Sequence, residues 1–300
     1  MTEASPLDTR PASPSPPRPP TADGSAGAAA QRRPFPVIRT VSWFAPLRWL
    51  NAGRRAFVAH PVPALFYGLC FAAMGWLLGA LLRGSPTLMM ALTCGFLLVG
   101  PLLAMGVYEI ARRHDRGEPV AIGDTTFAWD HNGLNIAILG IALGVLMMLW
   151  ARSSMMLIAI FFPRRMPGLD LLLEQLSSGA SLPFLGAYVA VGAVFALLVF
   201  ACSAIAIPLM LDRRTDAITA ILASLVAVGR NPGAMVFWAV LIVALTAAGF
   251  ASLFVGLIVT APWLGLATWY AYRDLVAPLP PDDGDEQRFS VQVSGGSRCP

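Results

Sequence analysis

Apolar stretches, each about long enough to cross a lipid bilayer, follow one another along most of the chain after residue 60. A helix needs about 20 apolar residues to cross the roughly 30 Å hydrocarbon core of a membrane. The alternation of apolar and polar segments therefore predicts an all-α membrane protein with a six-transmembrane-helix bundle over residues 41–276. The expected spans are about 62–82, 86–110, 134–151, 184–210, 234–250 and 255–274.

The last two spans divide one continuous apolar stretch, 234–272. A single helix of that length would measure about 58 Å at 1.5 Å per residue, nearly twice the thickness of the hydrocarbon core. We therefore expect a hairpin that turns near Gly249–Gly256. In the third span, Arg152 interrupts the apolar run before a further apolar stretch, 155–162. Arg152 is expected to snorkel to the headgroups, with 155–162 in the membrane interface; pairing with an acid in a buried site is the alternative.

Two segments have one apolar and one polar face and predict amphipathic helices that lie in the membrane interface. The first covers 45–59, and Asp212 is the expected N-cap of the second, at 212–230. The first has Pro46, Trp49, Leu50, Gly53 and Phe57 on its apolar face, and Arg48, Asn51, Arg54 and Arg55 on its polar face. The second has an apolar stripe of Ile218, Ile221, Leu222, Leu225 and Val228 or Gly229.

The order of these segments repeats. An amphipathic helix ends at His60-Pro61 or at Asn231-Pro232, and an apolar hairpin follows in both cases. The hairpins close with the same eleven-residue interval from proline to arginine, Pro101 to Arg112 and Pro262 to Arg273. We expect a divergent internal repeat of parallel type. Arginine clusters before the first span and in loops 111–133 and 211–232 place both termini in the cytoplasm.

Composition agrees with a chain that lies mostly in lipid. Hydrophobic residues make up 56% of the chain and charged residues 13%, against about 25% charged in soluble domains. The proline-rich tails, 1–40 and 277–300, are expected to be disordered because they lack the apolar residues needed to offset ordering entropy. No nucleic acid is expected as a partner; the basic excess lies at helix ends, where arginine contacts anionic headgroups.

No catalytic motif is present, so we expect a protein that is not an enzyme. The three histidines all lie outside the expected spans, and no Asp or Glu lies near the middle of one. Three of the four cysteines are single residues within apolar runs, where cysteine behaves as a small hydrophobe. The sequence therefore predicts no cofactor and no metal centre.

Charged residues at helix ends are the candidate site, as contacts for an anion or a lipid headgroup: Glu109, Arg112, Arg113 and Arg273. The alternative is local: Glu109 forms an ion pair one turn along its helix with Arg112 or Arg113, and Arg273 is an interfacial anchor. Glycines at four-residue or similar spacing predict close helix packing within the bundle or between protomers. They are Gly68, Gly75 and Gly79 in the first span, with Gly140 and Gly144 in the third.

Three groups of residues resemble the DUF2189 family of uncharacterised bacterial integral membrane proteins. They are Gly100–Glu109 with Arg112-Arg113 and Arg116–Pro119; Pro208–Arg213 with Asp216–Ala220 and Asn231-Pro232-Gly233; and Pro262–Arg273. The resemblance covers about 40–276 and implies a multi-pass protein of the bacterial inner membrane.

Some family members carry the label of cytochrome oxidase component. That role needs several histidines within the membrane, which this chain lacks.

We expect a scaffold or assembly factor that contacts membrane lipids and a second copy of itself or another membrane protein. The alternative is a permease-like transporter of a small neutral or anionic solute, with Arg112 and Arg273 at its cytoplasmic mouth.

Overall fold

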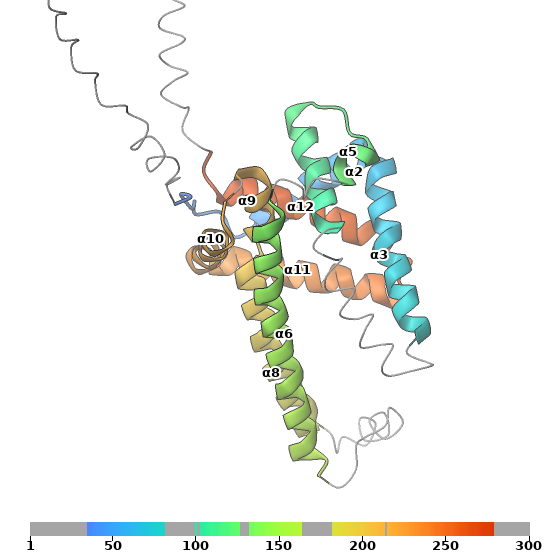
Figure 1. The fold of residues 1–300 in the computed structure, drawn as a ribbon, viewed down its shortest axis with the longest axis vertical. Helices are drawn as coiled ribbons and strands as arrows, with labels where there is room; N and C mark the ends of the chain where they lie inside the picture. Colours follow the sequence, from blue (N-terminus) through green and yellow to red (C-terminus); the bar gives the residue numbers. More distant parts are fainter. Residues whose placement is uncertain are drawn as a thin grey trace, which may run out of the picture. The chain divides into compact units, whose positions relative to one another are not determined.

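The structure, a computed structural model, describes residues 35–81, 100, 103–126, 132–163, 182–213 and 215–278. The tails (apart from their inner ends) and most of the predicted second span lie outside these residues. The chain divides into two units, Met1–Phe35 and Pro36–Pro300, and the helices with described bounds belong to the second. All the regular elements in the described part are helices (Figure 1).

Helices α2 (Ala45–Ala59) and α3 (Pro61–Leu81) meet at a sharp corner at His60. Each has a proline in its first turn, Pro46 in α2 and Pro61 in α3, where the missing N–H breaks no helical hydrogen bond. The two axes are bent by 108° at this junction. The predicted boundary at His60-Pro61 is therefore the corner between two helices.

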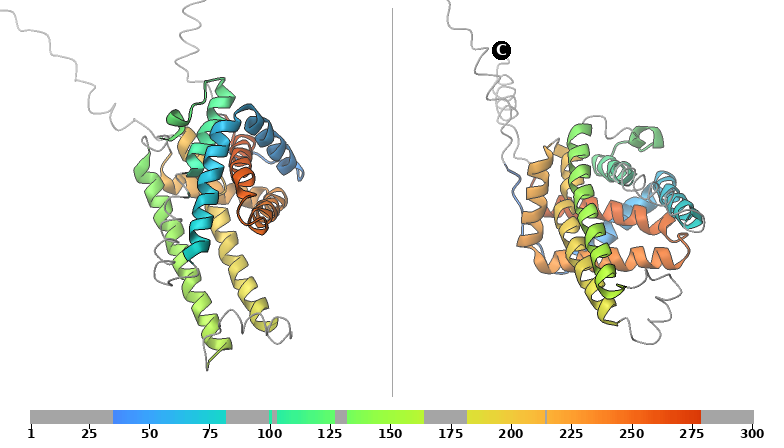
Figure 2. Two further views of the ribbon diagram at one scale, coloured as in Figure 1. Left: turned by 90° about the vertical axis from the view of Figure 1, so that its right-hand side faces the viewer. Right: turned by 60° about the horizontal axis from the view of Figure 1, so that its bottom comes forward.

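The apolar face of α2 packs against another helix of the same chain, α12 (Leu257–Leu275). Trp49 and Ala56 are buried, and a Cβ atom at Gly53 would meet the backbone of Ala267 at 2.7 Å. Figure 2 shows α2 and α3 on either side of α12. The prediction that this face of α2 turns toward lipid is therefore wrong. Periodicity shows that a face is apolar, but it does not show whether lipid or protein covers it.

The apolar stretch 234–272 folds as two helices, α11 (Pro232–Ala251) and α12, with a turn at 252–256, as its length predicts. Leu253 and Phe254 have φ angles of 55° and 69°, the left-handed region that non-glycine residues rarely adopt. Helix α3 holds this turn, because the indole of Trp76 donates to the Leu253 carbonyl oxygen at 2.7 Å. A side chain at Gly75 would overlap the Phe254 ring.

Helix α6 (Gly133–Phe161) lies beside α8 (Leu182–Ser203), and the two form a long pair (Figure 1). With 29 residues, α6 is longer than the predicted span 134–151. It continues through Arg152, so the stretch 155–162 mainly extends the helix instead of forming a separate interfacial segment. Aromatic rings fix the far end of the pair, with the Trp150 and Tyr188 centroids 6.3 Å apart.

The predicted fourth span ends in a break. Helix α8 stops at Ser203, and the short helix α9 (Ala206–Arg213) and then α10 (Ala217–Arg230) follow. The N-cap of α10 is Asp216, whose carboxylate accepts from the Thr219 backbone N–H at 2.9 Å. The prediction of Asp212 as the N-cap is wrong, since the chain is not yet in α10 at that residue.

Helix α10 turns its small residues inward. Alanines such as Ala220, Ala223 and Ala227 are buried, whereas Ile218 and Leu222 of the predicted apolar stripe are exposed. At 14 residues the helix is about 21 Å long, too short to cross a bilayer.

Three helical stretches in the described part are long and apolar enough to cross a membrane: Gly133–Phe161, Leu182–Arg213 and Pro232–Ala251. The bent pair of α2 with α3 makes a fourth if it counts as one span. The predicted count of six is not confirmed. One reason is that the second predicted span falls mostly outside the described residues. A second is that α12 carries Thr, Trp, Tyr, Arg and Asp, which lower its hydropathy.

An extended segment before α2 joins the two ends of the described chain. Ile38 forms an antiparallel bridge with Val276, and the Arg39 N–H donates to the Leu275 carbonyl oxygen at 2.7 Å. The buried Asn231 side chain accepts from the Val41 N–H at 2.8 Å and donates to the Arg39 carbonyl oxygen at 3.0 Å. The Asn231-Pro232 pair thus ends α10, starts α11 and fixes this segment.

Candidate functional site

The candidate residue Glu109 is buried at the centre of an ion-pair cluster on the helical segment 103–116. Only 3% of its side chain is exposed. One carboxylate oxygen lies 2.7 Å from Arg112 Nε and the other 3.0 Å from Arg113 Nε. Arg113 also reaches Asp124 in the short helix α5 (Ile122–Thr126), at 3.1 Å. These charges neutralise one another, as in the local ion pair that the three- and four-residue spacing allows.

The candidate Arg273 pairs with an acid on a different helix. Its Nε lies 3.8 Å from a carboxylate oxygen of Asp115, one turn beyond Arg112 in the segment 103–116. Asp115 also accepts from the Trp269 indole at 2.9 Å. The structure thus brings Arg112 and Arg273 to neighbouring parts of one charged region, but each has its own acid partner, Glu109 and Asp115. A site that holds an anion would first have to release these pairs.

The sequence analysis missed a second polar cluster, built on Tyr272 of α12. The Tyr272 hydroxyl donates to Asp212 at 2.7 Å and accepts from Arg213 Nε at 3.2 Å. Asp212 also lies 3.8 Å from Arg116, which links α9 to the segment 103–116. All four residues occur in the motifs that resemble the family, and this was the only signal in the sequence that could have joined them.

Two histidines that the sequence places 54 residues apart meet at the corner of α2 and α3. His60 Nε2 and His114 Nδ1 are 3.2 Å apart, within hydrogen-bond distance. Burial lowers the pKa of the His60 imidazole, and the charge of His114 lowers it further. No group of three or more His, Cys, Asp or Glu in the described part could hold a metal ion.

The glycines differ in what they touch. A side chain at Gly68 in α3 would collide with the Ile258 carbonyl of α12. That carbonyl has no helical partner because Pro262, four residues later, lacks an N–H. Gly79 approaches Phe254 more loosely, since a Cβ atom at this position would lie 3.6 Å from the ring. The space around Gly140 and Gly144 in α6 is open, with nothing within 4 Å.

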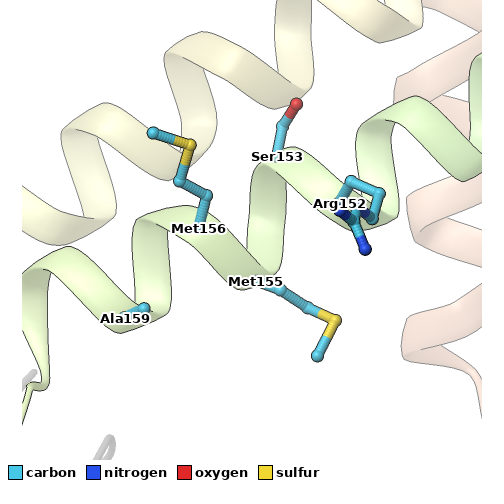
Figure 3. Close-up of a pocket in the computed structure, with 5 residues that line it drawn as sticks. All are labelled: Arg152, Ser153, Met155, Met156 and Ala159. Carbon is cyan, nitrogen blue, oxygen red and sulfur yellow. The ribbon is translucent and has the colours of Figure 1, made fainter.

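An open hollow of about 560 Å³ lies along the outer half of α6 (Figure 3). Its described lining residues all come from this one helix: Arg152, Ser153, Met155, Met156 and Ala159. In Figure 3, Arg152 and Met155 lie on one side of the helix, and Ser153 and Met156 on another.

Together the helices and the internally paired charges define a polytopic α-helical membrane protein with no catalytic constellation among the residues that the structure describes. The model of the DUF2189 family, described as a predicted integral membrane protein, matches residues 88–212. The family resemblance inferred from the motifs is thereby confirmed, although the motif Pro262–Arg273 lies beyond the matched range. No curated protein matches the chain, and no solved structure matches it.

Proposed function

We propose that this chain is a non-enzymatic protein of the bacterial inner membrane that acts through contacts with lipids or partner proteins, as a scaffold or assembly factor. The supporting observation is a contrast between its inside and its outside. Inside, the candidate charged groups are engaged with one another: Glu109 with Arg112 and Arg113, and Asp115 with Arg273. Such pairs hold helices in place and leave little charge free for a passing solute.

Outside, the membrane-length helices present apolar side chains that the protein does not cover. In the most apolar 18-residue window of α6, 11% is buried, and in that of α11, 22%. Ile141, Val145 and Met148 of α6 are among the exposed residues. Lipid or another protein has to cover these faces, because exposure of so much apolar surface to water is unfavourable. The faces are therefore the surfaces through which the chain acts.

The proposed topology has six spans with both termini in the cytoplasm. Three of the helical stretches meet the length and hydropathy expected of a span, and α3 and α12 would cross beside them. The equivalent order of α2, Pro61 and α3, and of α10, Pro232 and α11, supports the parallel repeat. Labelling of single cysteines introduced at 83–85 and 164–181 should come from the periplasmic side; labelling of either from the cytoplasm contradicts this topology.

Site-specific photo-crosslinking in native membranes tests the proposed function. A crosslinker at Val145, 47% exposed, should give one or a few defined adducts with lipid or with a single protein. The matched control is Leu139 on the same helix, which is 2% exposed and should link only within the chain. Adducts with many unrelated proteins, in proportion to their abundance, would contradict a specific scaffold.

Transport is the competing function and has its own readout. Purified protein in sealed proteoliposomes should show no uptake of small neutral or anionic solutes above empty vesicles. Uptake that disappears in Arg112→Ala or Arg273→Ala would establish a permease and overturn the scaffold.

A further inference from the structure

Polar groups mark two levels along α6. At its start, Asn132 donates to the Met210 and Thr215 carbonyl oxygens at 3.3 and 3.1 Å, and Asn135 accepts from the Ala217 N–H at 3.3 Å. This end of α6 therefore lies with the polar connection between α9 and α10. Arg152 is 19 residues beyond Gly133, a rise of about 28 Å along a straight helix. That distance is close to the thickness of the hydrocarbon core, so Arg152 reaches the opposite boundary of the membrane.

Aromatic residues support this position of the boundary. Trp150 and Tyr188 face each other beside Arg152, and Phe184 packs 5.6 Å from Tyr188. Trp and Tyr concentrate at the level of the lipid headgroups, where their rings meet both apolar and polar surroundings. The outer end of the α6–α8 pair thus has the composition of a membrane interface.

Arg152 differs from the arginines of the charged region because no described residue gives it a hydrogen bond or an ion pair. Arg48, Arg112 and Arg273 each lie within 4 Å of a carboxylate. The Arg152 side chain is exposed and borders the hollow on α6 (Figure 3). A guanidinium in this setting needs an anion, and at headgroup level the anion available throughout the membrane is a phosphate.

The rest of the hollow suits the apolar part of the same molecule. Met155 and Met156 are 60% and 67% exposed and provide flexible thioether side chains that adapt to an irregular apolar partner. Ser153 does not compete for the anion through its proton, because its hydroxyl donates to the Leu149 carbonyl oxygen at 2.9 Å. The hollow therefore combines one unpaired cation with apolar walls.

We propose that Arg152 binds the phosphate of a membrane phospholipid, whose acyl chain lies along Met155 and Met156. On the proposed topology the lipid belongs to the periplasmic leaflet. This inference rests on the proposed function, because it identifies one partner of the exposed α6 surface as a phosphate-bearing lipid.

The test uses the full chain, purified in mild detergent and stripped of lipid, with lipids added back one at a time. The probes are phosphatidylglycerol, a digalactosyl diacylglycerol without phosphate, and inorganic phosphate alone. Binding is followed by native mass spectrometry and by the shift in the thermal unfolding midpoint. Arg152→Gln removes the charge at similar size, Arg152→Lys retains it, and Arg273→Gln serves as the control at the other membrane boundary.

Arg152→Gln should bind phosphatidylglycerol about tenfold more weakly, the effect of losing one charge-assisted bond. Arg152→Lys and Arg273→Gln should keep most of the affinity, and the lipid-free unfolding midpoints should agree because Arg152 packs against no described partner. Unchanged binding in Arg152→Gln, or an equal dependence on Arg152 for the galactolipid, overturns the site. Stabilisation by inorganic phosphate alone to the same extent overturns the assignment to a lipid. Solute uptake by proteoliposomes would refute the scaffold and leaves these binding results to be judged separately.

Discussion

Replacing Glu109 with glutamine should destabilise the protein more than the loss of any surface ion pair. The carboxylate is 3% exposed and lies 2.7 Å from Arg112 and 3.0 Å from Arg113, which are 25% and 22% exposed. Two unit charges about 4 Å apart attract by about 4 kcal/mol at an effective dielectric constant of 20. Desolvation offsets part of this attraction, and breaking a buried pair from one side typically costs about 3 kcal/mol. We expect a loss of that size for Glu109→Gln.

The assay is reversible unfolding in mixed micelles, with a double-mutant cycle of Glu109→Gln and Arg113→Gln. The cycle should give a coupling energy of about 1–2 kcal/mol. Arg48→Gln is the matched control, because Arg48 pairs with Asp274 at 3.2 Å but is 66% exposed; it should cost at most about 1 kcal/mol. A loss for Glu109→Gln no larger than for Arg48→Gln would refute the buried pair. An increase in stability would identify Glu109 as a strained, functional carboxylate.

Three further predictions follow from single contacts. Gly68→Ala should destabilise by about 2 kcal/mol, because the methyl group meets the Ile258 carbonyl, whereas Gly140→Ala, in open space, should change stability by less than about 0.5 kcal/mol; equal effects in unfolding assays would contradict this packing. Asn231→Ala should cost about 2–3 kcal/mol and speed trypsin cleavage after Arg39, since the buried hydrogen bonds to the 39–41 segment are lost; an unchanged cleavage rate would argue against that role. Asp216→Ala should cost about 1 kcal/mol through loss of the N-cap. The Thr219 N–H holds the pKa of Asp216 below its usual value of 3.8, so this contribution is present above that pH and is lost on acidification through the lowered folded-state pKa; unfolding midpoints of the native chain and Asp216→Ala should converge at low pH.

The family motif Asn231-Pro232-Gly233 shows how much a sequence pattern can predict. Proline after asparagine predicts the end of one helix and the start of the next, and α10 and α11 meet there. The pattern does not show that the Asn231 amide binds a segment 190 residues earlier. It also does not show that a side chain at Gly233 would collide with Trp43. Both facts depend on parts of the chain that only folding brings together.

The charged site was predicted in the same uneven way. Spacing along one helix suffices to pair Glu109 with Arg112 and Arg113, because residues three and four apart lie on the same face. The partner of Arg273 is Asp115, and that of Tyr272 is Asp212, both on other helices. No periodicity relates such pairs. The sequence placed Arg273 at a helix end correctly but suggested an anion or headgroup in the position that a carboxylate of the same chain takes.

The sequence by itself determined that the chain is helical, that its helices are of membrane length, and where most of them end. These properties follow from local chemistry: runs of apolar residues, prolines at helix starts, and polar residues between them. Only the tertiary structure decided what covers each apolar face. It buried the face of α2 against α12 and left the large residues of α10 and the outer half of α6 uncovered. Lipid chains and apolar side chains are equally good surroundings for an apolar face, so the pattern of hydrophobic positions cannot distinguish them.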